Sequence, residues 1–185
     1  MKATFGVSLV VPEDLLAVSN GAQASRTPLG NGTDRVAFVD TIPLSTYLVA
    51  FVVGPLEATE PVDVDGVPVR IVHPPGRGHQ TAFALEVATH SLRWLADWYD
   101  LEVPGGKVDL VALPDFAFGA MENLGCITFR EVLLLVDPDE ADQRELEAVA
   151  SVVSHELAHL WFGDLVTMRW WNGIWLNEAF ATFME

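Results

Sequence analysis

Two histidines and a glutamate stand close together in the segment His155-Glu156-Leu157-Ala158-His159. Residues four apart lie one turn above each other on a helix, so both imidazoles can point at one metal ion, and this pairing is typical of zinc. Glu156 lies one step around the helix, close enough to hold a water molecule on the zinc without being a ligand. Zinc lowers the pKa of such a water to about 7, and a carboxylate can accept its proton as the water attacks a peptide carbonyl. The segment therefore predicts a hydrolytic zinc site with Glu156 as its general base.

A motif this short also arises by chance, so its surroundings matter. It lies inside a strongly apolar segment, residues 149–160, where two histidines and a carboxylate would be costly to bury unless they were paired. His73, His79 and His90 have no ligand spacing, and we expect each to be an ordinary surface or loop histidine. The surroundings therefore favour a metal site at the motif alone.

Zinc needs a third protein ligand, and Glu178 is the candidate. It follows His159 after eighteen intervening residues, on the next expected helix. A lone glutamate on a helix is usually a solvated surface residue. Glu178 lies between Leu176 and Phe180 on an apolar helix, which favours a role as ligand. We therefore expect one Zn²⁺ per chain, held by His155, His159 and Glu178.

The elements that must position these residues follow from hydrophobic periodicity and from turn residues. Asp142 is a candidate helix N-cap with Glu145 as its capping-box partner, and Gly163 is the candidate C-cap of the same helix. We expect strands at 3–11, 36–39, 47–53, 67–72 and 107–113, an extended segment at 125–136, and helices at 81–99, 142–162 and from 174 onward.

Composition narrows the classes of partner. The 185 residues are 50% hydrophobic and carry a net charge of −16, so nucleic acids and anionic membranes are poor partners. The plain interpretation of this charge is a solvated acidic surface, and the functional one is attraction of cationic peptides. Cys126 is the single cysteine, which excludes an intrachain disulfide and makes a reducing, cytoplasmic location the default expectation. No signal peptide opens the sequence, and its longest apolar run, residues 47–53, is far short of the ~20 residues that a membrane helix needs.

A second motif, Gly119-Ala120-Met121-Glu122-Asn123, precedes the extended segment. Alone it is a weak signal, and its plain interpretation is a turn entering a strand with Glu122 in water. Taken with the zinc motif and the spacing to Glu178, however, it resembles the gluzincin aminopeptidases of the aminopeptidase N type. The resemblance covers essentially the whole chain, and further segments carry it: residues 2–5, 43–51, 107–110, 114–116, 161–168, 170–172 and 175–178.

The resemblance implies a role for each matching residue. His155, His159 and Glu178 would bind zinc, and Glu156 would be the general base that later returns a proton to the leaving amine. Glu122 would bind the free α-ammonium group of a peptide. The substrate-binding segment would be formed by Gly119, Ala120, Met121, Glu122 and Asn123. In it, Gly119 and Ala120 would offer backbone hydrogen bonds to the substrate, which would bind in the manner of an added strand. The expected partners are therefore peptides with free N-termini.

The resemblance also implies the fold class and the domains. We expect an α+β protein in which residues 1–57 are the C-terminal part of an N-terminal antiparallel β-domain. Residues 58–185 would be the first half of a thermolysin-like mixed α/β zinc catalytic domain. Members of the family are much longer and have a tyrosine downstream of the third ligand that stabilises the oxyanion. This chain has only Tyr47 and Tyr99, so we expect a truncated piece with little or no activity alone.

Three other interpretations share part of this pattern. A thermolysin-type endopeptidase has the zinc geometry but no use for Glu122. An epoxide hydrolase occurs in one branch of the family, although Gly119-Ala120 favours the peptidase branch. A catalytically dead zinc-binding or scaffold module is the third alternative, and the intact zinc and substrate residues argue against it. Asp164 could orient a zinc-binding histidine or be purely structural.

Overall fold

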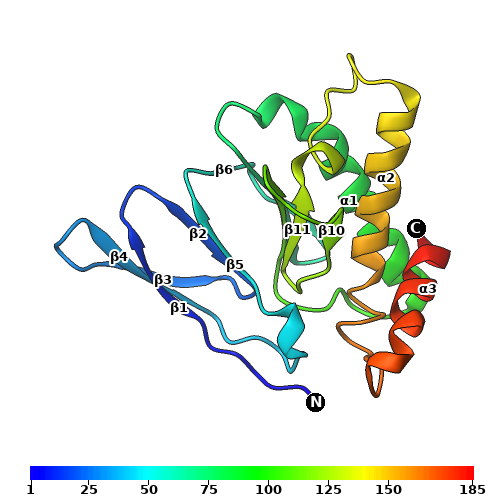
Figure 1. The fold of residues 1–185 in the computed structure, drawn as a ribbon, viewed down its shortest axis with the longest axis horizontal. Helices are drawn as coiled ribbons and strands as arrows, with labels where there is room; N and C mark the ends of the chain where they lie inside the picture. The colour runs from blue at the N-terminus through cyan, green and yellow to red at the C-terminus, as the bar shows by residue number, and fades with distance from the viewer.

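The computed structural model describes residues 1–185 and consists of β-sheets with three α-helices on one side (Figure 1). The N-terminal strands lie at one end of the molecule and the helices lie at the other. The expected α+β class is confirmed. The strands are β1 Ser8–Pro12, β2 Leu16–Ser19, β3 Gln23–Pro28, β4 Thr33–Phe38, β5 Phe51–Gly54, β6 Glu57–Ala58, β7 Val62–Val64, β8 Val67–His73, β9 Val108–Leu113, β10 Ala120–Met121 and β11 Cys126–Arg130. The α-helices are α1 Ala82–Tyr99, α2 Gln143–Ala158 and α3 Ile174–Met184.

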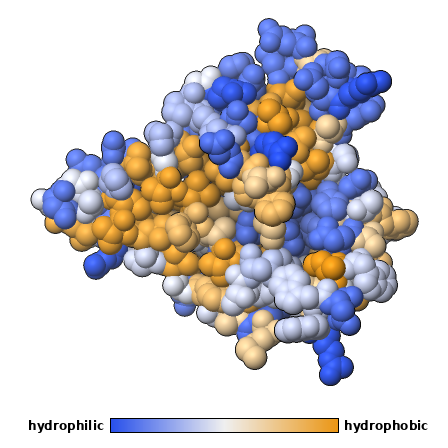
Figure 2. Space-filling view, viewed as in Figure 1, coloured by the Kyte–Doolittle hydropathy of each residue, from blue (hydrophilic) through white to orange (hydrophobic).

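The N-terminal region forms two antiparallel sheets. One has the order β1-β4-β3, and the other pairs β2 with β5. Figure 2 shows hydrophobic side chains spread over this region, and the exposed ones include Val10, Phe51 and Val53. Strand β5 ends at Gly54, and the next strand, β6, already pairs with β8 of another sheet. The chain therefore leaves the N-terminal sheets between β5 and β6.

A six-stranded mixed sheet forms the centre of the molecule. Its order is β10-β11-β9-β8-β6, with β7 also paired to β8, and β8, β9 and β11 run parallel. Parallel neighbours need a crossover connection, and α1 provides it between β8 and β9. The first five residues of β9 are buried, which agrees with its almost continuous apolar sequence, since a parallel strand is covered on both faces.

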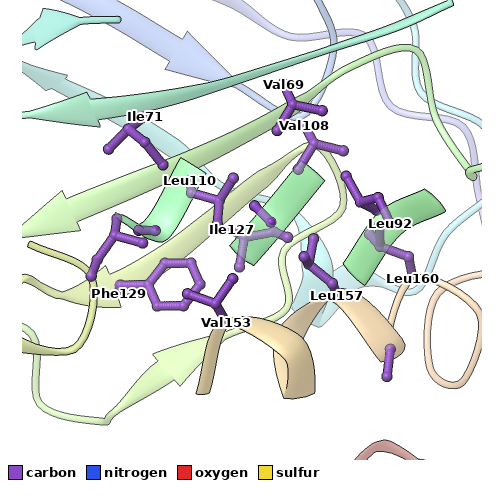
Figure 3. Close-up of a cluster of buried hydrophobic side chains, with 14 of the residues drawn as sticks. Val69, Ile71, Leu92, Val108, Leu110, Ile127, Phe129, Val153, Leu157 and Leu160 are labelled. Carbon is purple, nitrogen blue, oxygen red and sulfur yellow. The ribbon is translucent and has the colours of Figure 1, made fainter. Parts of the chain in front are cut away.

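The hydrophobic core fills the space between this sheet and the helices (Figure 3). Leu110, Ile127 and Phe129 of the sheet face Leu92 of α1 and Leu157 of α2, and all five are fully buried. On the opposite face, Val72, Val111 and Cys126 pack against Val18 of the N-terminal region. The packing therefore holds α2, which carries the zinc motif, against the central sheet.

The N-terminal region is joined to the central sheet by a buried amide. Asn20 Nδ2 donates to Leu48 O and Leu124 O, at 2.8 Å each, and Asn20 Oδ1 accepts from Ala50 N at 2.9 Å. Gly125 allows this close approach, because a Cβ there would lie 2.3 Å from Asn20 O and its φ is +71°. Residues 48 and 124 are thus held at a fixed separation.

Several expected elements differ in extent. Residues 47–53 are not one strand, because Thr46–Leu48 form a 3₁₀ turn and β5 begins only at Phe51. The strand expected at 125–136 ends at Arg130 and gives way to a second 3₁₀ turn. The helix expected to reach residue 162 ends at Ala158, so Gly163 is not its C-cap. None of the three α-helices has the combination of length and hydropathy that a membrane-spanning segment requires.

Candidate metal centre and peptide-binding site

Helices α2 and α3 supply the candidate metal ligands. The capping box expected at the start of α2 is confirmed: Asp142 Oδ1 accepts from Glu145 N, and Glu145 Oε2 accepts from Asp142 N, at 2.9 Å each. His155 lies in the last turn of α2, and His159 is its C-cap residue. Ala181, fully buried in α3, lies in the core that the two helices share, and Glu178 lies one turn before it.

The three candidate ligands converge on one point. His155 Nε2 and His159 Nε2 are 3.1 Å apart, and Glu178 Oε2 lies 3.5 Å from the first and 3.6 Å from the second. In the plane of these three atoms, the point equidistant from them is about 2.0 Å from each, which is the length of a zinc–nitrogen or zinc–oxygen bond. Two neutral imidazoles and a carboxylate are also the donor set of open zinc sites. The residues therefore fit a zinc ion.

A second set of contacts orients the two imidazoles. His159 Nδ1 donates to Phe162 O at 2.9 Å, because a carbonyl oxygen can only accept. His155 Nδ1 lies 2.9 Å from Glu185 Oε2, and the same argument makes it the donor to the carboxylate. With both Nδ1 atoms protonated, the Nε2 lone pairs are free for a metal. Phe162 O thus orients His159, a role for which Asp164 was one candidate. The sequence alone did not predict that Glu185 would orient His155.

Glu156 lies beside the three ligands and is almost buried, at 6% exposure. Its Oε2 atom has no hydrogen-bond partner. Burial, followed by the charges of Glu122 and Glu178, raises the pKa of Glu156 to about 8. A divalent cation between the ligands would oppose this shift by favouring the ionised carboxylate. The side chain is therefore suited to exchange a proton near neutral pH.

The second motif forms the edge of the central sheet. Ala120 and Met121 are β10, which pairs antiparallel with β11 and has no strand on its other side. Gly119 O accepts from Arg130 N at 2.8 Å. Asn123 is buried, and its Oδ1 atom accepts from Thr128 Oγ1 at 3.1 Å. These contacts fix the segment and leave one side of β10 available for an added strand.

Glu122 follows β10 and is turned into the protein, with only 6% exposure, rather than into water. Oxygen atoms of Glu122 and Glu156 and a ring nitrogen of His159 lie within 4.8 Å of one another. The structure thus brings Glu122 to the same place as the zinc motif. It lies next to the general-base candidate and next to one of the candidate ligands.

One contact of Glu122 comes from a residue that the sequence analysis assigned no role. Tyr47 Oη donates to Glu122 Oε1 at 3.2 Å. Burial raises the pKa of Tyr47, and the charges of Glu122 and Asp164 raise it further, so the hydroxyl keeps its proton and can donate. No local signal could have found this contact, since 75 positions separate the two residues.

Asp164 and the three histidines outside the zinc motif are not part of the candidate ligand set. Asp164 is fully buried with no hydrogen-bond partner for either carboxyl oxygen, and burial, followed by the charge of Glu122, raises its pKa well above the ordinary value. His73 was expected at the surface or in a loop, but it ends β8, is 3% exposed and contacts Pro74 O through Nδ1. His79 and His90 are exposed, as expected.

Comparisons with known proteins identify the family of the chain. The Peptidase family M1 domain matches residues 83–185, and the Peptidase M1 N-terminal domain matches residues 1–48. The chain is 47% identical to puromycin-sensitive aminopeptidase of Caenorhabditis elegans, over 100% of the chain and 20% of that protein. It is 44% identical to aminopeptidase M1 of Arabidopsis thaliana, over 100% of the chain and 21% of that protein. It is 43% identical to endoplasmic reticulum aminopeptidase 2 of Bos taurus, over 100% of the chain and 19% of that protein. The chain thus spans about a fifth of the length of these relatives. Because a family domain matches more than half of it, the chain belongs to peptidase family M1, a family of metallopeptidases.

Proposed function

We propose that the protein is a zinc-dependent aminopeptidase that removes N-terminal residues from peptides. The observation that carries this proposal is the convergence of His155 Nε2, His159 Nε2 and Glu178 Oε2 at zinc-binding separations, with the Glu122 carboxylate beside them. Relatives over the whole chain are named aminopeptidases, which supports it further. Because the chain spans about a fifth of those relatives, the activity is proposed for the protein expressed from its complete coding sequence.

When bound, zinc would polarise the carbonyl of the first peptide bond and lower the pKa of a water molecule. Glu156 would accept a proton from that water as it attacks, and would later donate the proton to the leaving amine. The buried, partner-free Oε2 atom of Glu156 is available for both transfers. His155, His159 and Glu178 would hold the metal and take no proton.

The amine end of the substrate would be recognised by Glu122. A carboxylate at a fixed distance from the metal pairs with an N-terminal ammonium group and places the first peptide bond at the reaction centre. The free edge of β10, at Ala120 and Met121, would pair with the backbone of the bound peptide, while Gly119 and Asn123 flank this edge. We place the domain division at 57/58, so that Glu122 and the ligands belong to a catalytic domain of residues 58–185.

The test compares two peptides that differ only in their N-terminus. We expect the purified protein to release the first residue of a free-amine peptide, to lose this activity with a zinc chelator and to regain it with added Zn²⁺. The N-acetylated peptide should be cleaved at least about a hundredfold more slowly, because it cannot pair with Glu122. Equal cleavage of both peptides would instead indicate an endopeptidase. Stoichiometric zinc without cleavage of either would indicate a binding module.

A further inference from the structure

Tyr47 links three parts of the candidate site that are far apart in the sequence. It lies in the 3₁₀ turn of the N-terminal region, within the segment matched by the M1 N-terminal domain. Its hydroxyl donates to Glu122 Oε1 at 3.2 Å and accepts a long hydrogen bond from Asn177 Nδ2 at 3.5 Å. Asn177 directly precedes Glu178 on α3. One hydroxyl group therefore connects the amine-binding candidate with the helix that carries the third metal ligand.

Glu122 depends on this hydroxyl more than on any other donor. Tyr47 provides the only hydrogen bond to the Glu122 carboxylate in the structure. The carboxylate is almost buried, and Glu156 and Asp164, which are both acidic, are its neighbours. A buried carboxylate without a donor is costly and free to turn about its last torsion. With the bond to Oε1 in place, Oε2 is the oxygen that remains for a ligand.

The tyrosine is itself held from several directions. Its ring packs edge-on against Trp171, with the ring centroids 5.2 Å apart. The amide of Asn20 donates to Leu48 O and to Leu124 O. Leu48 directly follows Tyr47, and Leu124 lies two positions after Glu122. The backbone close to each partner of the Tyr47–Glu122 hydrogen bond is thus tied to the same buried side chain. These contacts restrict the Tyr47 ring and its turn, which favours a fixed position for the hydroxyl that donates to Glu122.

We propose that Tyr47 is a positioning residue for Glu122, so that the N-terminal β-region supplies part of the amine-binding site and sets its spacing from the metal. The inference rests on the proposed function, in which Glu122 pairs with the substrate's ammonium group. It assigns a substrate-positioning role to a residue outside the Gly119–Asn123 segment. Its consequence is that removing one hydroxyl, 75 positions from Glu122, weakens recognition of the free N-terminus.

The test is Tyr47→Phe in the protein expressed from its complete coding sequence, assayed with a free-amine peptide. Phenylalanine keeps the ring against Trp171 and removes only the hydroxyl. Loss of a hydrogen bond to a charged group predicts a rise in KM of about tenfold, with kcat changed by less than about threefold. Tyr99→Phe is the matched control, since its buried hydroxyl has no partner, and KM should stay within about twofold.

A double-mutant cycle with Glu122→Gln separates positioning from a general structural effect. If Tyr47 acts through Glu122, Tyr47→Phe should change KM by less than about twofold once Glu122 is replaced. An unchanged KM in Tyr47→Phe, or an equal increase with and without Glu122, would overturn the inference while leaving the proposed function intact. If Glu122→Gln itself left KM unchanged, the proposed function and this inference would both fail.

Discussion

We predict that Glu185 increases the affinity of the site for zinc. Only the three-dimensional structure associates this residue with the site. Its Oε2 atom lies 2.9 Å from His155 Nδ1 and fixes the tautomer that points Nε2 at the metal. Replacing it with alanine leaves the His155 ring free to turn and makes its nitrogen a weaker ligand. Losing such an outer partner costs 10- to 100-fold in metal affinity. The Glu185 side chain is 31% exposed, so water can partly replace it, and we predict a loss of about tenfold, or about 1.4 kcal/mol.

The assay is competition for zinc between the protein and a chromogenic chelator at pH 7. Glu185→Gln keeps an acceptor oxygen and should lose less than about threefold. Glu140→Ala is the control: it removes the same charge from an exposed turn, and salt at 0.15 M, with a Debye length of about 8 Å, should screen any remaining effect. If Glu185→Ala bound zinc as tightly as the unchanged protein, or if Glu140→Ala weakened binding equally, the orienting role of Glu185 would be refuted.

Three further predictions test separate parts of the structure. Glu156→Gln should lower kcat by at least about a hundredfold while zinc stays bound, because only the general base is lost; a drop in zinc content would contradict this. Asn20→Ala should lower the free energy of unfolding by about 2–4 kcal/mol in urea titrations, since it breaks three hydrogen bonds and leaves buried carbonyls without a donor. A loss below about 0.5 kcal/mol would show that Asn20 does not tie the N-terminal region to the sheet. Burial raises the pKa of Cys126 to about 12, so at pH 8 its thiol should react with a thiol reagent only after unfolding, and rapid reaction in the folded protein would contradict its burial.

Local sequence patterns were enough to select the candidate metal ligands and to predict the helices that carry them. The capping box of Asp142 and Glu145 marks the start of α2, because its two hydrogen bonds join residues three apart. The spacing of His155 and His159 is likewise a property of one helical turn. Glu178 was recognised from its distance along the chain and its apolar neighbours, and the structure brings it within 3.6 Å of both imidazoles.

The contacts around the ligands could not be predicted in this way, since they are made by tertiary packing. Tyr47 reaches Glu122 from a 3₁₀ turn that hydrophobic periodicity had assigned to a strand. Glu185 meets His155 only because α3 packs on α2, and Phe162 orients His159 through its backbone, which no side-chain pattern reveals. His73 ends a strand that is covered from both sides, so neighbouring elements rather than its own polarity decide its burial.

The most direct test of the central claim is a crystal structure of the zinc-loaded protein with anomalous data at the zinc edge. We predict a single strong peak about 2.0–2.2 Å from His155 Nε2, His159 Nε2 and Glu178 Oε2, with Glu122 facing the same space. A peak elsewhere in the molecule, or zinc bound by the histidines with Glu178 more than about 3 Å away, would contradict the account.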